Sequence, residues 1–335
     1  MKRTIITLIF ILMQTLVFGF IITVDNKSPS AGNYTTLQDA HDVATAGDTI
    51  FVYPSGVSYA GINVTKKLIL YGTGFENDFV ETGIMNITSI SGTMTFSEGA
   101  DSSILSGFGT DFHVIIDADN IQIKRNKFNN IKVYENHSGT VIMQNYIFTT
   151  NNISYALTVD QSNEVIVNNN IIFDNDVSHS QNGISADGAT ITITILNNVI
   201  KADHYTLFIR DANEYVVNNI FFGDGECWNC SNENIAYIFN ISSNNNNWPA
   251  GNGNLNGIDM DDVFIPGWES GNYHLLDSLA IGSGLDGIDR GIYGGDAPYI
   301  DGGIPSLPSI YQLQTPFIGS KQSGLDVIIK AKTNE

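Results

Sequence analysis

The sequence predicts an all-β fold, a right-handed parallel β-helix solenoid with a short N-terminal capping helix. One observation is repetition: the middle of the chain repeats a phrase of β-branched residues and asparagine. A repeat of roughly 20–50 residues is typical of stacked supersecondary units. The other is composition. Of the 335 residues, 42% are hydrophobic but only 15% are charged. Abundant Asn, Gly, Ile, Thr and Val favour strands and turns over helices.

The N-terminus has the pattern of an export signal. Lys2 and Arg3 precede an apolar run from Ile5 to Phe20, in which Gly19 offers a small residue for cleavage. We therefore expect residues 1–19 to be a signal peptide. A retained membrane anchor is the alternative, but a bilayer span needs about 20 apolar residues, so the run is short for one. The mature protein is expected to be secreted or at the cell surface, without membrane insertion after cleavage.

One helix is expected at residues 35–46, ahead of the coils. Thr36 is a candidate N-cap with Asp39 three residues later, and Gly47 supplies a stop. A stack of strands has an open end, and a helix at this point in the chain would cover it.

Five segments in the middle of the chain share an asparagine at a similar place in each repeat. These asparagines, spaced by 19, 25, 28 and 21 residues, are Asn126, Asn145, Asn170, Asn198 and Asn219. We expect each at the bend between two strands, where Asn tolerates left-handed geometry and its amide bonds the Asn or backbone of the next coil. The short β-branched runs disfavour helical repeats. A β-sandwich is the runner-up, but it offers no reason for a recurring Asn-Asn phrase.

The domain boundaries follow this rhythm. The β-helix domain is expected to span residues 20–300. The repeat breaks within it at residues 225–262, where we expect an irregular insertion. Residues 301–335 are expected to form a tail that begins with Pro-punctuated sequence and ends in a final strand at 325–329.

The two cysteines, Cys227 and Cys230, form a Cys-Trp-Asn-Cys sequence. In an exported chain they are expected to form a small disulfide staple or to remain idle thiols. A redox site is the alternative, because C-x-x-C spacing tunes thiol pKa. No βαβ pattern surrounds the pair, which disfavours the redox interpretation.

Three features resemble the right-handed β-helix repeat family of the pectin-lyase-like superfamily. The opening residues 34–40 and 46–50 are similar to its N-terminal cap and first strand, and the Asn-Asn-x-Ile coils are similar to its repeats. The phrases at 280–282 and 289–295 resemble the closing segment of exported bacterial members. The resemblance implies a fold. It does not select a function, because this fold hosts lyases, hydrolases, epimerases and non-catalytic surface proteins.

The formal net charge of -20 excludes two classes of partner. An acidic surface repels nucleic-acid phosphates and anionic lipid. It suits cations or neutral glycans, whereas an acidic polysaccharide would need a bridging cation. Calcium is therefore the one possible cofactor.

Carboxylates recur about ten residues before successive asparagines, at Asp117, Glu135, Asp160, Asp187 and Asp211. If the coils stack in register, these side chains form a column along one edge of the solenoid. One interpretation is a ladder that binds calcium or saccharide. The favoured interpretation is turn chemistry, because Asp caps turns through its own backbone.

Catalytic candidates are few. The resemblance implies that a lyase of this fold would use an Arg or Lys base beside calcium. Arg210, next to Asp211, is the best match, although a surface salt bridge with Asp211 is favoured for it. The Arg-x-Pro-x-x-Arg pattern of pectate lyases is absent, and of the hydrolase motifs only Asp261-Asp262 occurs.

Aromatic residues gather late in the chain, where they would stack on sugar rings or fill the interior. They are Trp228, Trp248, Trp268, Tyr205, Phe208 and Tyr273. We expect a monomeric, non-catalytic surface protein with a glycan-contact or envelope-structural role. The alternatives are a polysaccharide lyase or glycoside hydrolase acting on an acidic polysaccharide, and a fragment of a larger surface protein.

Overall fold

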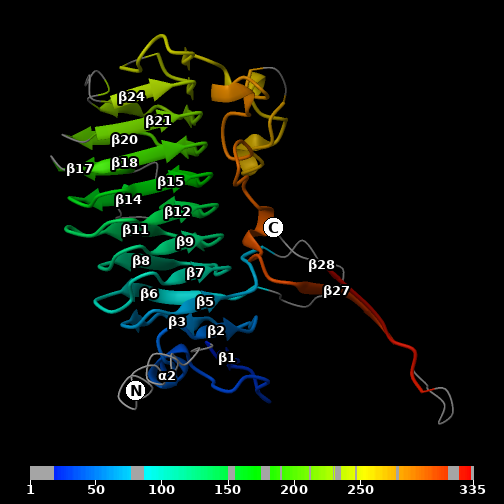
Figure 1. Cartoon of the computed structure of the whole chain (residues 1–335). Helices are drawn as coiled ribbons and strands as arrows, with labels where there is room; N and C mark the ends of the chain where they lie inside the picture. The colour runs from blue at the N-terminus through cyan, green and yellow to red at the C-terminus, as the bar shows by residue number, and fades with distance from the viewer. Residues whose placement is uncertain are drawn as a thin grey trace, which may run out of the picture.

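A computed structural model of the chain describes residues 19–76, 87–149, 155–174, 182–188, 191–210, 213–228, 230, 235–245, 247–276, 279–315 and 324–332. Its body is a stack of coils whose strands run parallel to those of the next coil (Figure 1). The predicted parallel β-helix is confirmed. The predicted signal peptide lies outside the described residues, apart from Gly19. Within the described ranges, no helix has the length and apolar character needed to cross a bilayer.

The described strands of the body form three parallel sheets, A, B and C. Between residues 122 and 242 the chain visits them in that order in each coil, whereas before residue 122 the described strands belong to sheets A and C. Sheet A contains β1 (Ile21–Val24), β2 (Thr49–Val52), β5 (Ile69–Tyr71), β7 (Ile104–Ser106), β9 (Gln122–Lys124), β12 (Val141–Met143), β15 (Val165–Asn168), β18 (Thr192–Leu196), β21 (Asn213–Val217) and β24 (Ile235–Ile238). Sheet B contains β10 (Lys127–Phe128), β13 (Tyr146–Thr149), β16 (Ile171–Asp174), β19 (Val199–Lys201), β22 (Ile220–Phe222), β25 (Ile241–Ser242) and β26 (Leu255–Asn256). Sheet C contains β3 (Tyr59–Ala60), β4 (Asn63–Val64), β6 (Ile90–Phe96), β8 (Phe112–Ile116), β11 (Asn130–Val133), β14 (Tyr155–Asp160), β17 (Asn182–Asp187), β20 (Tyr205–Arg210) and β23 (Glu226–Trp228).

Alternation along the strands builds the core. In β8, Phe112, Val114 and Ile116 are buried, whereas His113 and Ile115 between them are partly exposed. Successive side chains of a strand point to opposite faces, and neighbouring strands lie about 4.8 Å apart. Apolar side chains therefore stack on one another along the whole interior.

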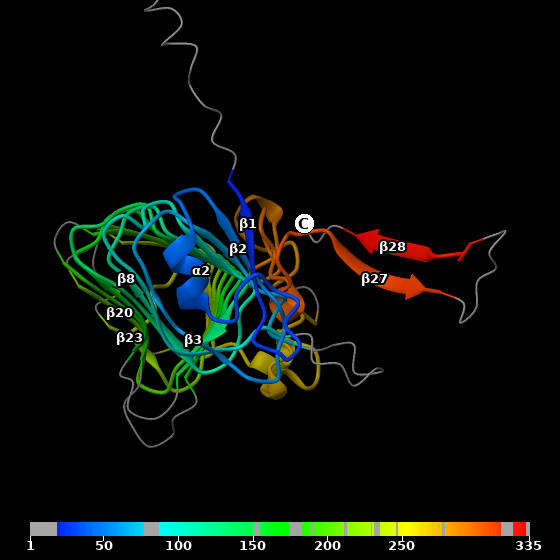
Figure 2. The same cartoon turned by 90° about the horizontal axis from the view of Figure 1, so that it is seen from below.

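The N-terminal end is covered by α2 (Leu37–Val43), which lies across the end of the solenoid (Figure 2). Thr36 caps it, because its hydroxyl accepts a 3.1 Å hydrogen bond from the backbone N–H of Asp39. Leu37 and Ala40 are buried against the first coils. The helix is shorter than the expected range of 35–46, since Ala44 already has extended backbone angles.

A column of buried asparagine amides runs along the corner between sheets A and B. Each Nδ2 donates to the Oδ1 of the next asparagine at 3.0–3.2 Å, and each also donates to a carbonyl of the preceding coil. The column contains the five predicted residues and two more, in the order Asn126, Asn145, Asn170, Asn198, Asn219, Asn240 and Asn254. We refer to it as the asparagine ladder.

We expected the ladder asparagine itself to adopt the left-handed conformation at this corner. The structure places that conformation at the residue before it. The φ angles are 59° at Arg125, 57° at Gln144, 53° at Asn169, 52° at Asn197 and 57° at Asn218. One left-handed residue turns the chain from sheet A to sheet B. The asparagine after it then points inward while the left-handed residue points outward. The cost of about 1–2 kcal/mol per non-glycine residue is offset by the ladder bonds.

The structure contradicts the irregular insertion that we expected at residues 225–262. Residues 226–256 continue the solenoid through β23, β24, β25 and β26. The rhythm of the sequence breaks because the turns change length. The ladder persists, with only 14 residues between Asn240 and Asn254.

After β26 the chain returns along the outside of the A–B corner as an extended strap, residues 279–307 (Figure 1). The outward row of left-handed residues holds its backbone. Asn169 donates to the carbonyls of Ile292 and Gly294 at 2.8 and 2.7 Å, and Arg125 donates to that of Ile304 at 3.1 Å. The strap includes the short 3-10 helices η4 (Leu285–Gly287) and η5 (Asp301–Gly303).

Arg290 fastens the upper part of the strap. Its buried guanidinium donates to the carbonyls of Ser283, Asn240 and Gly253 at 2.7–3.2 Å. Burial lowers its pKa to about 10, which leaves the group charged at neutral pH.

Beyond the strap, β27 (Ser309–Gln314) and β28 (Ile328–Lys332) pair as an antiparallel hairpin that extends away from the solenoid (Figures 1 and 2). The expected final strand at 325–329 therefore begins later, at Ile328. It pairs with β27 and not with a coil.

Replacing Asn198 by Ala should destabilise the protein by about 3 kcal/mol or more, because the backbone N–H and side-chain amide of Asn170 lose their buried acceptor. Urea unfolding followed by circular dichroism measures the change. The exposed Asn163→Ala variant is the control, with an expected change within about 0.5 kcal/mol. Equal losses in the two variants would contradict the role given to the ladder.

Replacing Arg290 by Ala should loosen the strap while the coils remain folded, because three carbonyls lose their charged donor. Limited proteolysis followed by mass spectrometry should show faster cleavage within residues 279–307. Asp296→Ala, an exposed change in the same segment, is the control. Unchanged cleavage in Arg290→Ala would show that the strap is held by other contacts.

Candidate functional site

The candidate site lies on the outer face of sheet C, over β14, β17, β20 and β23. Register places outward side chains of successive coils in columns. Phe208 pairs with Ser185 in one neighbouring strand and with Trp228 in the other. Tyr155 and Tyr205 both pair with Asn182, from opposite sides. Residues far apart in the sequence are thereby brought together on one surface.

Four rings form what we call the aromatic platform: Tyr155, Tyr205, Phe208 and Trp228. The rings of Phe208 and Trp228 are stacked, with centroids 5.6 Å apart and planes 19° apart. Tyr205 contacts both of these rings, at 5.8 and 5.5 Å, and Tyr155 lies 6.2 Å from Phe208. Trp228 is 46% exposed, so part of the platform faces solvent.

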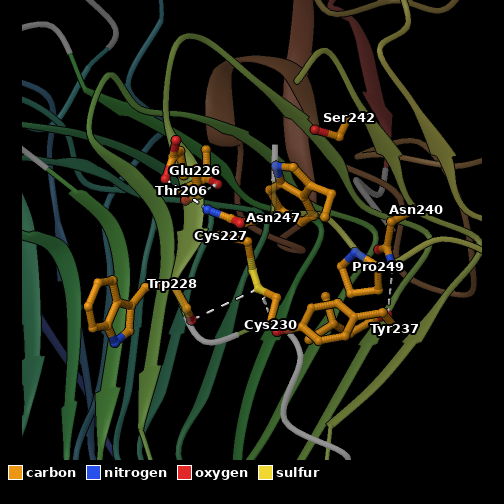
Figure 3. Close-up of a disulfide and its surroundings, with 12 residues drawn as sticks. Thr206, Glu226, Cys227, Trp228, Cys230, Tyr237, Asn240, Ser242, Asn247 and Pro249 are labelled. Carbon is orange, nitrogen blue, oxygen red and sulfur yellow. Dashed lines mark hydrogen bonds between the residues drawn. A yellow bond between two sulfur atoms is a disulfide. The ribbon is translucent and has the colours of Figure 1, made fainter. Parts of the chain in front are cut away.

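The position of Trp228 follows from alternation in β23. Its neighbour Cys227 is buried and points into the solenoid, and the structure pairs it with Cys230 as a disulfide. The Tyr237 hydroxyl donates to the Cys230 sulfur at 3.0 Å. Figure 3 shows Trp228 pointing away from this inner cluster. The disulfide therefore ties down the end of the strand that presents the tryptophan.

Charged side chains border the platform. Arg210 forms a 2.9 Å salt bridge with Asp187, and its guanidinium lies 5.7 Å from the centre of the Phe208 ring. Lys132 lies 3.8 Å from Asp160. These paired charges supply both hydrogen-bond donors and acceptors at the edge of an aromatic surface.

The structure corrects the expected carboxylate column. Asp160 and Asp187 are register partners, but the next partner of Asp187 is Arg210. Register also places Tyr134, and not Glu135, between Asp117 and Asp160. The prediction counted back from the asparagines, and this count fails because the turns differ in length. Asp211 lies outside the described residues.

Two carboxylates of this edge lie beside one histidine ring. Asp117 lies 2.9 Å from Nε2 of His137, and Asp119 lies 3.4 Å from Nδ1 of the same ring. Among the described residues, no group of three or more His, Cys, Asp or Glu side chains gathers in a metal-binding arrangement. Along the edge of sheet C, Asp160 and Asp187 thus form ion pairs with Lys132 and Arg210, and Asp117 and Asp119 contact His137.

The catalytic candidates are separated as well. Arg210 is engaged with Asp187. Asp261, in η2 (Met260–Asp262), accepts a 2.8 Å hydrogen bond from the indole N–H of Trp268. The Asp261-Asp262 pair thus belongs to a different part of the surface from Arg210.

The late aromatic residues occupy three places. Tyr205, Phe208 and Trp228 belong to the platform. Trp248 lies in the core, 4.3 Å from the Phe221 ring. Trp268 and Tyr273 pack over Phe222, on the outer face of sheet B. Sequence analysis missed Tyr155 as a platform member, because only the strand register links it to Tyr205.

Comparison with protein-family models, with curated proteins and with solved structures gives no match to this chain. The functional inference therefore depends on the geometry of the platform and its charged border.

Replacing Arg210 by Ala should change stability by less than about 1 kcal/mol, because its salt bridge with Asp187 is largely solvent-exposed. Thermal unfolding of the wild type, Arg210→Ala and Asp187→Asn measures this. A loss of several kcal/mol in either variant would show that the pair is a structural core contact and not part of an accessible surface.

Proposed function

We propose that this protein is an exported or cell-surface β-helix protein of the pectin-lyase-like superfamily that contacts glycans without catalysis. The observation that carries the proposal is the aromatic platform, in which Phe208 and Trp228 present nearly parallel rings on an outer sheet face. A contiguous aromatic patch on a protein surface, unlike a single exposed ring, is typical of a binding site.

A sugar ring complements such a surface. Its C–H faces are apolar and weakly positive, and they meet the negative face of an aromatic ring. Its hydroxyls need donors and acceptors at the edge, which Arg210, Asp187, Lys132 and Asp160 provide. Sites for small polar ligands commonly combine apolar surface with a few placed polar groups.

The platform also fits an extended polymer. Phe208 and Trp228 are on adjacent coils, and Tyr155 is two coils from Tyr205. Strands in neighbouring coils are about 4.8 Å apart. A chain of sugars lying along the stacking direction would therefore meet Tyr155 on one coil, the polar Asn182 and Ser185 on the next, and the other three rings on the two coils beyond.

Charge favours a neutral glycan. The whole chain carries a formal net charge of -20, while the cations at the platform, Arg210 and Lys132, are already paired with Asp187 and Asp160. An acidic polysaccharide would meet repulsion unless calcium bridged the two.

An enzyme acting on an acidic polysaccharide, a lyase or a glycoside hydrolase, is the second candidate. Arg210 at the edge of the platform favours it, because an arginine can serve as the base of a lyase. Its salt bridge with Asp187 argues against this role, since a base must reach the substrate in a proton-accepting form.

Export is supported by two features. The N-terminal run of apolar residues after Lys2 and Arg3 has the pattern of a signal peptide. The disulfide between Cys227 and Cys230 is a bond typical of oxidising compartments.

The test is a panel of neutral and acidic polysaccharides, with and without calcium. Retention and the release of unsaturated or reducing ends are measured together. We expect retention of a neutral polysaccharide without new ends. Trp228→Ala should weaken binding at least about tenfold, equivalent to about 1.4 kcal/mol, because a stacking ring is lost.

Tyr215→Ala is the matched control, because Tyr215 is a similarly exposed aromatic on sheet A, at 43%. It should leave retention unchanged. Equal effects of the two substitutions, or no retention of any glycan, would end the proposal. New chain ends that disappear in Arg210→Ala would establish the enzymatic alternative.

A further inference from the structure

A cavity in the surface lies on the outer face of sheet B. It has a volume of about 550 Å³ and is bounded by β16, β19 and β22 on one side. The segment from Gly257 to Tyr273, which includes η2 and η3 (Trp268–Ser270), forms the other side. Cavities of roughly 300–1,000 Å³ are typical of small-molecule sites.

The floor of this cavity is a column of three outward side chains from consecutive coils. Phe173 pairs with Lys201, which in turn pairs with Phe222. The Lys201 ammonium lies 4.5 Å from the centre of the Phe173 ring. The floor therefore offers the partly exposed Phe173 ring with a cationic donor over it, and the buried Phe222 ring supports Trp268.

Trp268 forms a wall whose orientation is set by its contacts. The indole N–H donates to Asp261 at 2.8 Å, and the ring meets Phe222 edge-on at 5.5 Å. Gly267 and Gly271 flank η3 with φ angles of 95° and 96°, a conformation that glycine adopts without strain. The turns at Gly267 and Gly271 place the Trp268 ring over Phe222 of sheet B.

Polar groups surround the aromatic floor and wall. The carboxylates of Asp224, Asp259 and Glu269 line the cavity and are exposed, and Ser243 adds a hydroxyl. Three carboxylates repel an anionic ligand, whereas the Lys201 ammonium disfavours a cation at the floor. A neutral ligand with many hydroxyls avoids both repulsions. It can also bond both kinds of group, because carboxylates accept hydrogen bonds and the ammonium donates them.

We propose that this cavity binds a neutral saccharide of the size of a mono- or disaccharide. Trp268 contacts its apolar ring face, and Lys201 and the carboxylates bond its hydroxyls. The site is separate from the aromatic platform, lies on a different sheet and does not depend on the platform being a glycan site.

The test is isothermal titration of the full mature chain with glucose, galactose, mannose, N-acetylglucosamine, cellobiose and lactose. Glucuronate and glucosamine are the charged counterparts. We expect at least one neutral sugar to bind more tightly than either charged counterpart. Trp268→Ala should weaken that binding at least tenfold, and Trp268→Phe should restore part of it, because it keeps an aromatic face.

Asp224→Asn tests the polar side of the site without altering the packed rings, and should weaken binding of the same sugar. Tyr215→Ala, on sheet A, is the control and should leave the affinity unchanged. The proposal is overturned if no neutral sugar binds, if a charged counterpart binds more tightly, or if neither Trp268→Ala nor Asp224→Asn weakens binding. Polysaccharide retention by the platform is a separate measurement, so failure of one proposal is distinguishable from failure of the other.

Discussion

The asparagine ladder is the interaction on which the rest of the structure depends. The amides from Asn126 to Asn240 are buried from solvent, and each finds hydrogen-bond partners in the coil above and the coil below. A coil that shifted by one residue would leave Asn170 or Asn198 with unpaired donors, at a cost of about 1–3 kcal/mol for each group. The ladder therefore keeps the coils from Asn126 to Asn254 in register although the turns differ in length.

The corner that contains the ladder also supplies the side chains that bind the strap. Turning the chain with one left-handed residue sends that side chain outward, immediately before the inward asparagine. Arg125, Gln144 and Asn169 consequently present donors to a segment more than 120 residues later in the chain. The left-handed turn thus produces a column of polar side chains inside the solenoid and a second row of polar side chains outside it.

Both candidate binding surfaces follow from the same register. Because the ladder aligns the coils, outward positions of sheets B and C become columns, and aromatic residues in them become neighbours. The platform contains Tyr155 and Trp228, and the cavity floor contains Phe173 and Phe222. None of these pairs is adjacent in the sequence. Only the number of residues in each turn decides which ones meet, and turn length is the least regular property of this repeat.

The sequence by itself determined the solenoid, its capping helix and the five central ladder asparagines, because repetition and β-branched strands express local preferences. The tertiary structure decided which residue turns the corner, that Asn240 and Asn254 extend the ladder, and that Arg210 pairs with Asp187. It also divided the late aromatic residues among platform, core and cavity. These outcomes depend on register between coils, which arises from packing over the whole stack and leaves no local signal in any one segment.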